Sequence, residues 1–177
     1  MTMLKKLLIV LCLFFTLSHF VHCYGQDYKG AVGGRFGYGI GLTGVYIFNP
    51  YGGHGLEFLL RYGYHGLILN KPGINIQVLY EKHWEIGRRG YWTAYLGAGP
   101  ALGFGKKVFQ SKEVCMALGI SPIVGIDYTT QRLRVPLILA FDYKPTLNGD
   151  IPLTKTGQKG VNFSYYEISF SVRVGIR

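Results

Sequence analysis

The chain has 177 residues, a formal net charge of +10 and a hydrophobic content of 49%, with 26 glycines and 14 tyrosines. That hydrophobic content excludes a disordered chain, and the length suits one domain after removal of an export signal. Only three cysteines are present, and two of them lie in the first 25 residues, which excludes a disulfide framework and a thiolate metal site.

Residues 1–25 are predicted to form a secretory signal peptide. Lys5 and Lys6 precede an unbroken apolar run over residues 7–15, which is too short to span a bilayer as a helix, and a cleavage point follows near residues 23–25. Lipid modification of Cys23 is an alternative, although the residues before it are bulky. An exported chain does not meet nucleic acid, so we expect the basic charge to face anionic lipid head groups.

Residues 26–177 are predicted to form one domain with eight strands. Apolar and polar residues alternate in eight stretches between turn residues, as is typical of strands with one apolar and one polar face. The alternation is most regular at the end of the chain, and it is least clear around Gly37–Gly39. The predicted strands cover residues 31–38, 40–49, 55–65, 74–86, 91–104, 117–128, 135–144 and 165–177.

The lengths of the connections indicate how these strands are arranged. The second, fourth and sixth connections are short turns, whereas the fifth and seventh, residues 105–115 and 145–162, are the two longest. Short periplasmic turns and longer outer loops are typical of bacterial outer-membrane barrels. The sequence therefore predicts an all-β fold, an eight-stranded antiparallel up-and-down transmembrane β-barrel in the outer membrane.

The polar face of the predicted strands carries most of the acidic residues. An Arg or Lys that faces lipid costs about 2–4 kcal/mol at the midplane, so this face is expected to point inward. Eight strands leave an interior just wide enough for side chains, which disfavours a channel and requires the charges to pair. The predicted interior charge network consists of Arg35, Glu57, Arg61, Glu81, His83, Asp127, Asp142, Lys144, Glu167 and Arg173.

Aromatic residues near the strand ends lie on the opposite, outward face. They are predicted to anchor the barrel at the membrane interfaces, and the alternative is an apolar surface beneath another layer. These interface aromatics are Tyr62, Tyr64, Trp84, Trp92, Tyr128 and Tyr143. Lysines in the long outer loops suit either lipopolysaccharide phosphates or plain solvation; they are Lys106, Lys107, Lys112, Lys155 and Lys159.

A small exported barrel has two alternatives to a non-enzymatic role in the membrane. A barrel hydrolase that modifies lipid A needs a nucleophile and a base near the outer rim, where His65 is the inward histidine but has no serine clearly beside it. A soluble, lipocalin-like barrel needs its apolar faces inside. His54, beside a turn, is expected to be solvated. No histidine or carboxylate cluster has metal-ligand spacing, so we expect no metal site and no cofactor.

Short motifs resemble small outer-membrane β-barrel proteins of diderm bacteria, the OmpA/OmpX-like and PorT-like families. The motifs are L-Y-E-K-H at Leu79–His83, Y-L-G-A-G-P at Tyr95–Pro100, F-D-Y-K-P at Phe141–Pro145 and the amphipathic last strand. The resemblance implies an eight-stranded barrel, mostly without an assigned activity. We expect a monomer whose partners are outer-membrane lipids, lipopolysaccharide and the barrel-assembly machinery. The chain departs from these families because it ends in Ile176-Arg177 rather than in an aromatic residue.

Overall fold

The structure, a computed structural model, describes residues 28–37, 39–49, 51–63, 73–86, 91–106, 114–130, 135–152, 160–164 and 167–176. None of these residues lies in a helix that is long and apolar enough to cross a membrane. The predicted signal peptide lies outside this range. The strands are β1 (Gly30–Gly37), β2 (Gly39–Asn49), β3 (His54–Gly63), β4 (Gly73–Ile86), β5 (Trp92–Lys106), β6 (Val114–Thr130), β7 (Leu137–Tyr143), β8 (Thr146–Pro152), β9 (Gly160–Ser164) and β10 (Ile168–Ile176).

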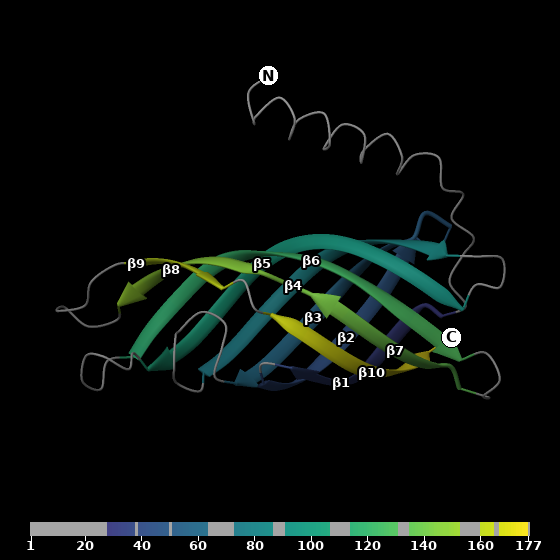
Figure 1. Cartoon of the computed structure of the whole chain (residues 1–177), viewed down its shortest axis with the longest axis horizontal. Coiled ribbons are helices and arrows are strands. Elements are labelled where there is room, and N and C mark those ends of the chain that lie inside the picture. The colour runs from purple at the N-terminus through teal and green to yellow at the C-terminus, as the bar shows by residue number, and fades with distance from the viewer. Residues whose placement is uncertain are drawn as a thin grey trace, which may run out of the picture.

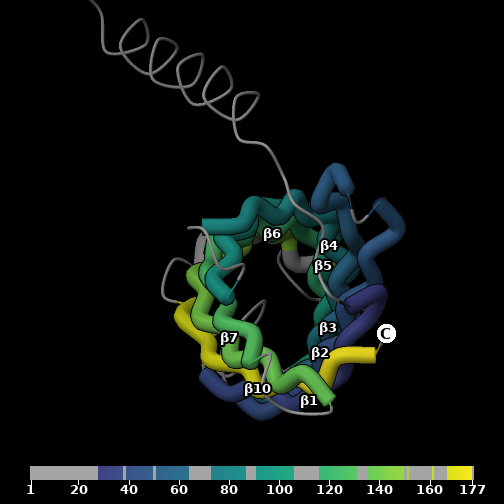
Figure 2. The backbone as a smooth tube through the Cα atoms, turned by 90° about the vertical axis from the view of Figure 1, so that its right-hand side faces the viewer, coloured from purple at the N-terminus to yellow at the C-terminus, as the bar shows by residue number. Residues whose placement is uncertain are grey.

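The strands form one closed antiparallel barrel. Strands that follow each other in the sequence pair side by side from β1 to β6, β6 pairs with both β7 and β8, and β10 pairs with β1 to close the ring (Figures 1 and 2). Because β7 and β8 form one barrel strand and β9 and β10 form the next, the barrel has eight strands. The prediction of an eight-stranded antiparallel barrel is confirmed.

The prediction of a loop over residues 145–162 was wrong. β8 continues from β7 after Pro145, and it pairs with β6 in the same register, since Val124 faces Tyr143 and Ile120 faces Leu147. Proline has no backbone N–H to donate to the neighbouring strand, so it interrupts the hydrogen bonding. In a sequence it therefore usually indicates the end of a strand. Here the chain stays extended on both sides of the proline.

The two ends of the barrel differ in their connections. The terminal end, where Lys29 and Ile176 lie, carries the connections β2–β3, β4–β5 and β6–β7. The distal end carries the other connections, of which β1–β2 is a single residue, 38. The structure describes β3 as far as Gly63 and β4 from Gly73. Residues 64 and 65, the last two of the predicted third strand, lie outside the described residues.

The predicted turn after β2 is present, and its residue types explain its shape. Gly52 donates its backbone N–H to the side-chain oxygen of Asn49 at 2.9 Å. Gly53 has a φ of 64°, a left-handed conformation that glycine adopts without steric cost. Asparagine and glycine thus reverse the chain within four residues between β2 and β3.

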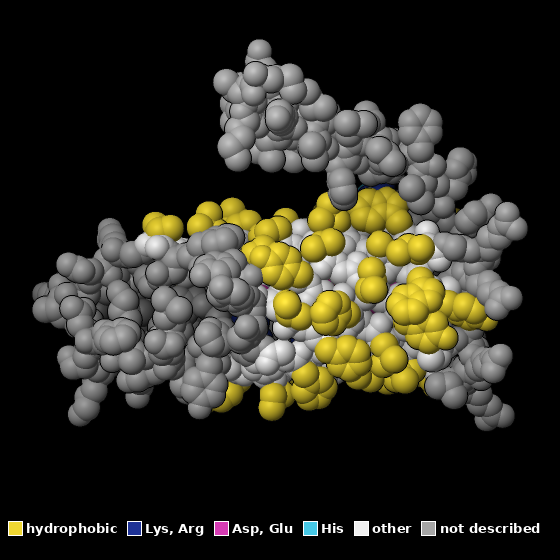
Figure 3. Space-filling model, viewed as in Figure 1, with side chains coloured by type: hydrophobic (Ala, Val, Ile, Leu, Met, Phe, Trp, Pro, Cys, Tyr) yellow, Lys and Arg dark blue, Asp and Glu magenta, His cyan; other side chains and the backbone are white. Residues whose placement is uncertain are grey.

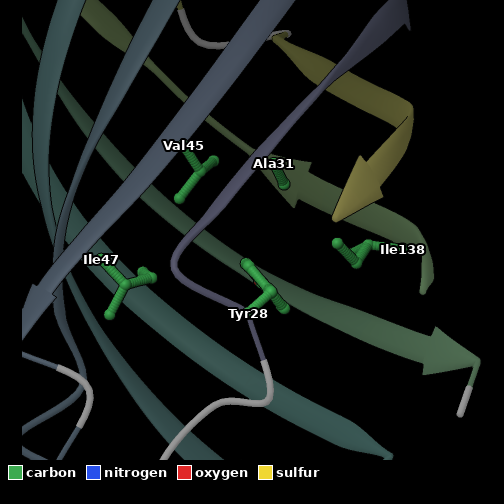
Figure 4. Packing of buried hydrophobic residues seen from close by; sticks show 5 residues of the cluster. All are labelled: Tyr28, Ala31, Val45, Ile47 and Ile138. Atoms are coloured by element: carbon green, nitrogen blue, oxygen red, sulfur yellow. The ribbon is translucent and has the colours of Figure 1, made fainter. Parts of the chain in front are cut away.

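Apolar side chains fill parts of the barrel interior beside the charge network. One cluster lies at the terminal end, where side chains from the start of β1, the end of β2 and the start of β7 meet beside the segment that precedes β1 (Figure 4). Its members are Tyr28, Ala31, Val45, Ile47 and Ile138. A second cluster contains Leu59, Leu79, Tyr95, Ile123 and Ala140. Burial of these side chains stabilises the barrel from within.

Glycines on the inward face let neighbouring strands approach closely. A Cβ atom on Gly33 would lie 2.0 Å from the carbonyl oxygen of Val172, across the β1–β10 pairing that closes the barrel. Gly44, on the adjacent strand β2, faces outward, and a Cβ atom there would be no nearer than 3.8 Å to another heavy atom. Gly33 is therefore required by packing, whereas Gly44 is not.

We predict that Gly33→Ala lowers the free energy of unfolding by at least about 1–3 kcal/mol, because backbone atoms must shift to admit the methyl group. Gly44→Ala is the matched control and is expected to change stability by less than about 0.5 kcal/mol. Urea unfolding followed by the fluorescence of Trp84 and Trp92 measures both variants. Equal losses of stability would contradict the close approach of β1 and β10.

Candidate functional site

All ten residues of the predicted interior charge network lie inside the barrel and are nearly inaccessible. Arg61 is the most exposed of them at 6%, and Glu57, Glu81, His83, Asp127 and Arg173 are at 0%. They reach the interior because each occupies an inward position in the alternation of its strand. A buried charge is tolerated only when it is paired, so the contacts among these side chains decide whether the barrel is stable.

Glu57 on β3 is the centre of the network. Its Oε1 atom accepts hydrogen bonds from Arg35 Nη1 on β1 at 3.3 Å and from Arg173 Nη2 on β10 at 2.5 Å. It also accepts a hydrogen bond from Thr43 Oγ1 on β2 at 2.6 Å. Four strands are therefore held by one carboxylate. Charge-assisted hydrogen bonds of this kind are about twice as strong as neutral ones.

Arg35 extends the network across the barrel. Its second guanidinium nitrogen donates to Asp142 on β7, and the other oxygen of Asp142 accepts a hydrogen bond from the Tyr95 hydroxyl on β5 at 3.2 Å. Arg35 thus bridges Glu57 and Asp142, two carboxylates on strands that are not neighbours. Contacts of this type fix the width of the barrel as well as the register of its strands.

A second group of charges lies toward the distal end. Arg61 donates to both oxygens of Glu167, at 3.1 and 3.2 Å, in a forked arrangement that favours a single geometry. Lys144 Nζ lies 3.7 Å from Glu167 and also donates to the side-chain oxygen of Gln77. This distal group therefore joins β3 and β4 to the two strands that are interrupted near residues 144 and 167.

A third group lies toward the terminal end and contains the only buried histidine among the described residues. His83 Nε2 lies 3.1 Å from Glu81, and His83 Nδ1 lies 4.0 Å from Asp127. The imidazole also stacks on the ring of Tyr95, with 5.2 Å between centroids. Among the described residues, no group of three or more His, Cys, Asp or Glu side chains is placed to hold a metal ion.

The network is nearly neutral, unlike the chain as a whole. Five of the nine acidic residues lie in it, but only four of the nineteen lysines and arginines do. The excess positive charge of the chain therefore lies outside the network. This distribution suits an interior whose positive and negative charges largely offset one another, and it leaves the basic residues available to anionic surfaces.

The outward face is an apolar belt that runs around the barrel. Figure 3 shows apolar side chains over most of the described surface on one side, with few charges among them. Large side chains alternate with the buried polar ones along every long strand. Examples with about half of their surface exposed are Val32, Phe36, Tyr46, Phe58, Leu60, Leu118, Val124, Phe141, Ile168 and Val174.

The predicted interface aromatics lie on this belt where the structure describes them. Tyr62, Trp92 and Tyr143 are exposed, and Trp84 and Tyr128 are half-buried. Trp92 packs against Tyr128, with 5.0 Å between ring centroids. Tyr64 and the candidate base His65 lie outside the described residues. An outward tryptophan–tyrosine pair at the terminal end of the strands is what a membrane interface favours.

A shallow groove of about 750 Å³ interrupts the belt on the side formed by β10, β1, β2, β3 and β4. It passes over Gly44, where no side chain fills the space between Val32 and Phe58, and its walls are almost wholly apolar. Such a groove suits hydrocarbon, and it offers no charged side chain to a polar substrate.

Several contributors to the interior were not among the predicted residues. Thr43, Gln77 and Tyr95 bond members of the network, although their inward positions in the alternation could have identified them. His54 is partly exposed, and in addition its Nδ1 atom lies 2.5 Å from the Tyr80 hydroxyl and its ring stacks on Phe48. This contact joins β3 to β4 on the outside of the barrel and could not be read from spacing alone.

Comparisons with family models, curated proteins and solved structures found no match to this chain. The conclusion about its function therefore rests on the geometry of the charge network and the apolar belt.

We predict that Glu57→Leu lowers the free energy of unfolding by about 3–5 kcal/mol, because it leaves Arg173 buried without its carboxylate partner. Lys29→Gln removes a unit charge from an exposed position and serves as the control, with an expected change within about 0.5 kcal/mol. The measurement is urea unfolding of the folded barrel, followed by tryptophan fluorescence. A loss for Glu57→Leu no larger than that of the control would show that the network is not needed for stability.

Proposed function

We propose that this protein is a non-enzymatic, integral outer-membrane β-barrel with a structural or interaction role. The observation that carries the proposal is the inverted distribution of side chains. The charge network is buried in the interior, and apolar side chains cover the outside. A soluble protein rarely exposes a contiguous apolar patch of more than a few hundred Å², whereas a barrel in a bilayer requires an apolar belt.

The belt and the strand architecture support a membrane location together. A spanning sheet must satisfy every backbone polar group without water, which only a closed barrel achieves. The closing pair β1–β10 removes the sheet edges over eight residue pairs, from Gly30–Ile176 to Gly37–Ser169. Strands of about 9–11 residues suffice to cross a bilayer at a tilt, and β2, β3, β4, β5 and β6 meet that length.

The predicted signal peptide and the excess basic charge support the same proposal. Export would bring the barrel to the assembly machinery of the outer membrane, as in the OmpA/OmpX-like and PorT-like barrels that the sequence resembles. Basic residues outside the network suit contact with anionic lipids and lipopolysaccharide phosphates. The charged interior does not support a lipocalin-like site for an apolar ligand, which requires apolar faces inside, and eight strands disfavour a channel.

The first test is the location and heat-modifiability of the protein. We expect it in the outer-membrane fraction, with different mobilities on SDS gels before and after boiling, because a folded barrel resists the detergent. A protein found soluble in the periplasm, with one mobility, would contradict the proposal.

The second test compares two substitutions on the outward face of β3. Phe58→Arg, near the middle of the strand, is expected to cost about 2–4 kcal/mol of unfolding free energy in lipid vesicles. Tyr62→Arg, near the strand end, is expected to cost about 0–1 kcal/mol. Equal and small effects of both substitutions would indicate that water rather than lipid surrounds this face.

A further inference from the structure

β5 and β6 form a hairpin whose backbone pairing is continuous, whereas the pairing of this hairpin with the strands on either side is interrupted. The two strands pair without a gap from Trp92–Tyr128 to Lys106–Val114. On the other flank of β5, the pairing with β4 skips two residues on each strand between Gln77–Ala101 and Tyr80–Ala98.

On the other flank of β6, the pairing with β7 ends at Val124–Tyr143 and resumes with β8 at Ile120–Leu147. The wall of the barrel is thus interrupted on both sides of this hairpin.

Two prolines face each other across the gap between β6 and β7–β8. Three residues on each strand separate the flanking pairs, and Pro122 and Pro145 are the middle ones. Lys144 donates its backbone N–H to Glu167 on the opposite side, so the polar groups of Pro145 point toward β6.

Thr129 donates its backbone N–H to the carbonyl oxygen of Tyr91, the residue before β5, so the backbone groups of even-numbered residues in β6, Pro122 included, point toward β7–β8. At each of these two positions, a residue other than proline would donate its backbone N–H to the carbonyl oxygen of the residue opposite. Proline has no N–H group, so both hydrogen bonds are missing.

A third proline weakens the other flank at the same level. Pro100 on β5 stands opposite Val78 in the gap with β4, and within the hairpin it pairs with Ile120, two residues from Pro122. The last barrel strand adds an irregularity beside the gap. Between the pairs Tyr143–Ile168 and Thr146–Ser164, three residues of β9–β10 stand opposite two residues of β7–β8. Pro100 and Pro122 are exposed on the outward face, and Pro145 is half-exposed there.

Polar side chains lie directly behind the gap between β6 and β7–β8. Ser121 and Thr146 point inward at 0% exposure, and their hydroxyl oxygens are 2.6 Å apart. Lys144, also inward, belongs to the distal group with Gln77 and Glu167. In place of the two missing backbone bonds, the hydroxyl groups of Ser121 and Thr146 join the two strands at this point. The weakest part of the wall therefore separates surrounding lipid from a polar part of the interior.

We propose that this gap is a lateral window. The wall opens between β6 and β7–β8 at Pro122 and Pro145 and admits a membrane-dissolved amphiphile, whose polar head group hydrogen-bonds to the hydroxyls of Ser121 and Thr146. The inference rests on the proposed membrane location. Local opening is cheapest where backbone hydrogen bonds are missing, and two are missing here.

The test compares two buried serines in a Cys115→Ser chain. Ser121→Cys places a thiol behind the window, and Ser171→Cys places one at 0% exposure on β10, whose ladders to β1 and β7 are uninterrupted there. The probe is pyrene maleimide dissolved in phosphatidylcholine vesicles, and labelling is read on the peptide that contains each position. Unboiled mobility on gels shows that both variants are folded.

We expect labelling at position 121 to be at least about tenfold faster than at position 171, because missing hydrogen bonds favour local opening. Adding Pro122→Ala and Pro145→Ala restores two donors and should bring the rate at position 121 down to that at position 171. Equal rates at the two positions, or a rate at position 121 that the alanines leave unchanged, would overturn the window.

Amide hydrogen exchange of the unmodified protein gives a test that needs no substitution and no vesicle. Backbone amides that border the gap, such as those of Ile120 and Leu147, should exchange faster than those of Phe170 and Val172 on β10. Uniform protection would overturn the window. Failure of the chain to insert into vesicles would contradict the membrane location, whereas the exchange measurement would still decide the window in detergent or in water.

Discussion

The pairing of charges inside a narrow barrel is the constraint on which the rest of this structure depends. Eight strands leave no room for the water that would otherwise solvate Glu57, Arg35 and Arg173, so each must find a partner on another strand. Those partners come from β1, β2, β3, β7 and β10, which meet only when the barrel is closed in one register. A shift of one residue in any of these strands would turn its charged side chains outward. The network therefore specifies the closure that also places the apolar side chains on the outside.

Much of this arrangement could be predicted from the sequence, because a period of two reports directly which face a residue occupies. Glu57, Asp142 and Arg173 were assigned to the interior on that basis. The alternation does not report which inward residues lie at the same height, since that depends on how far the strands are staggered around the ring. It therefore could not show that Arg35 bridges Glu57 and Asp142, or that His83 stacks on Tyr95.

The error at Pro145 and the features that the sequence could not show have a common physical origin, because each depends on a neighbouring strand. Pro145 was taken as the start of a loop because proline usually ends a strand, yet the strand continues beyond it and only the hydrogen bonding stops. Gly33 was placed on the polar face of the first strand, but the alternation could not show that glycine is needed there because β1 and β10 approach each other closely. His54 was predicted to be solvated because it lies beside a turn, and it is partly exposed, but its contact with Tyr80 on the next strand could not be predicted. In each case the structural role of the residue depends on its contacts with the neighbouring strand.

The unequal connections at the distal end have a consequence for recognition. A single residue joins β1 to β2 there, whereas residues 64–72, 107–113 and 153–159 join the remaining pairs of strands. The length of chain that a partner could contact at this end is thus unequal around the rim, since the β1–β2 hairpin contributes a single connecting residue. A partner that binds this end would therefore meet an asymmetric target. Sequence change that alters binding would then accumulate in three segments while the β1–β2 link stays short.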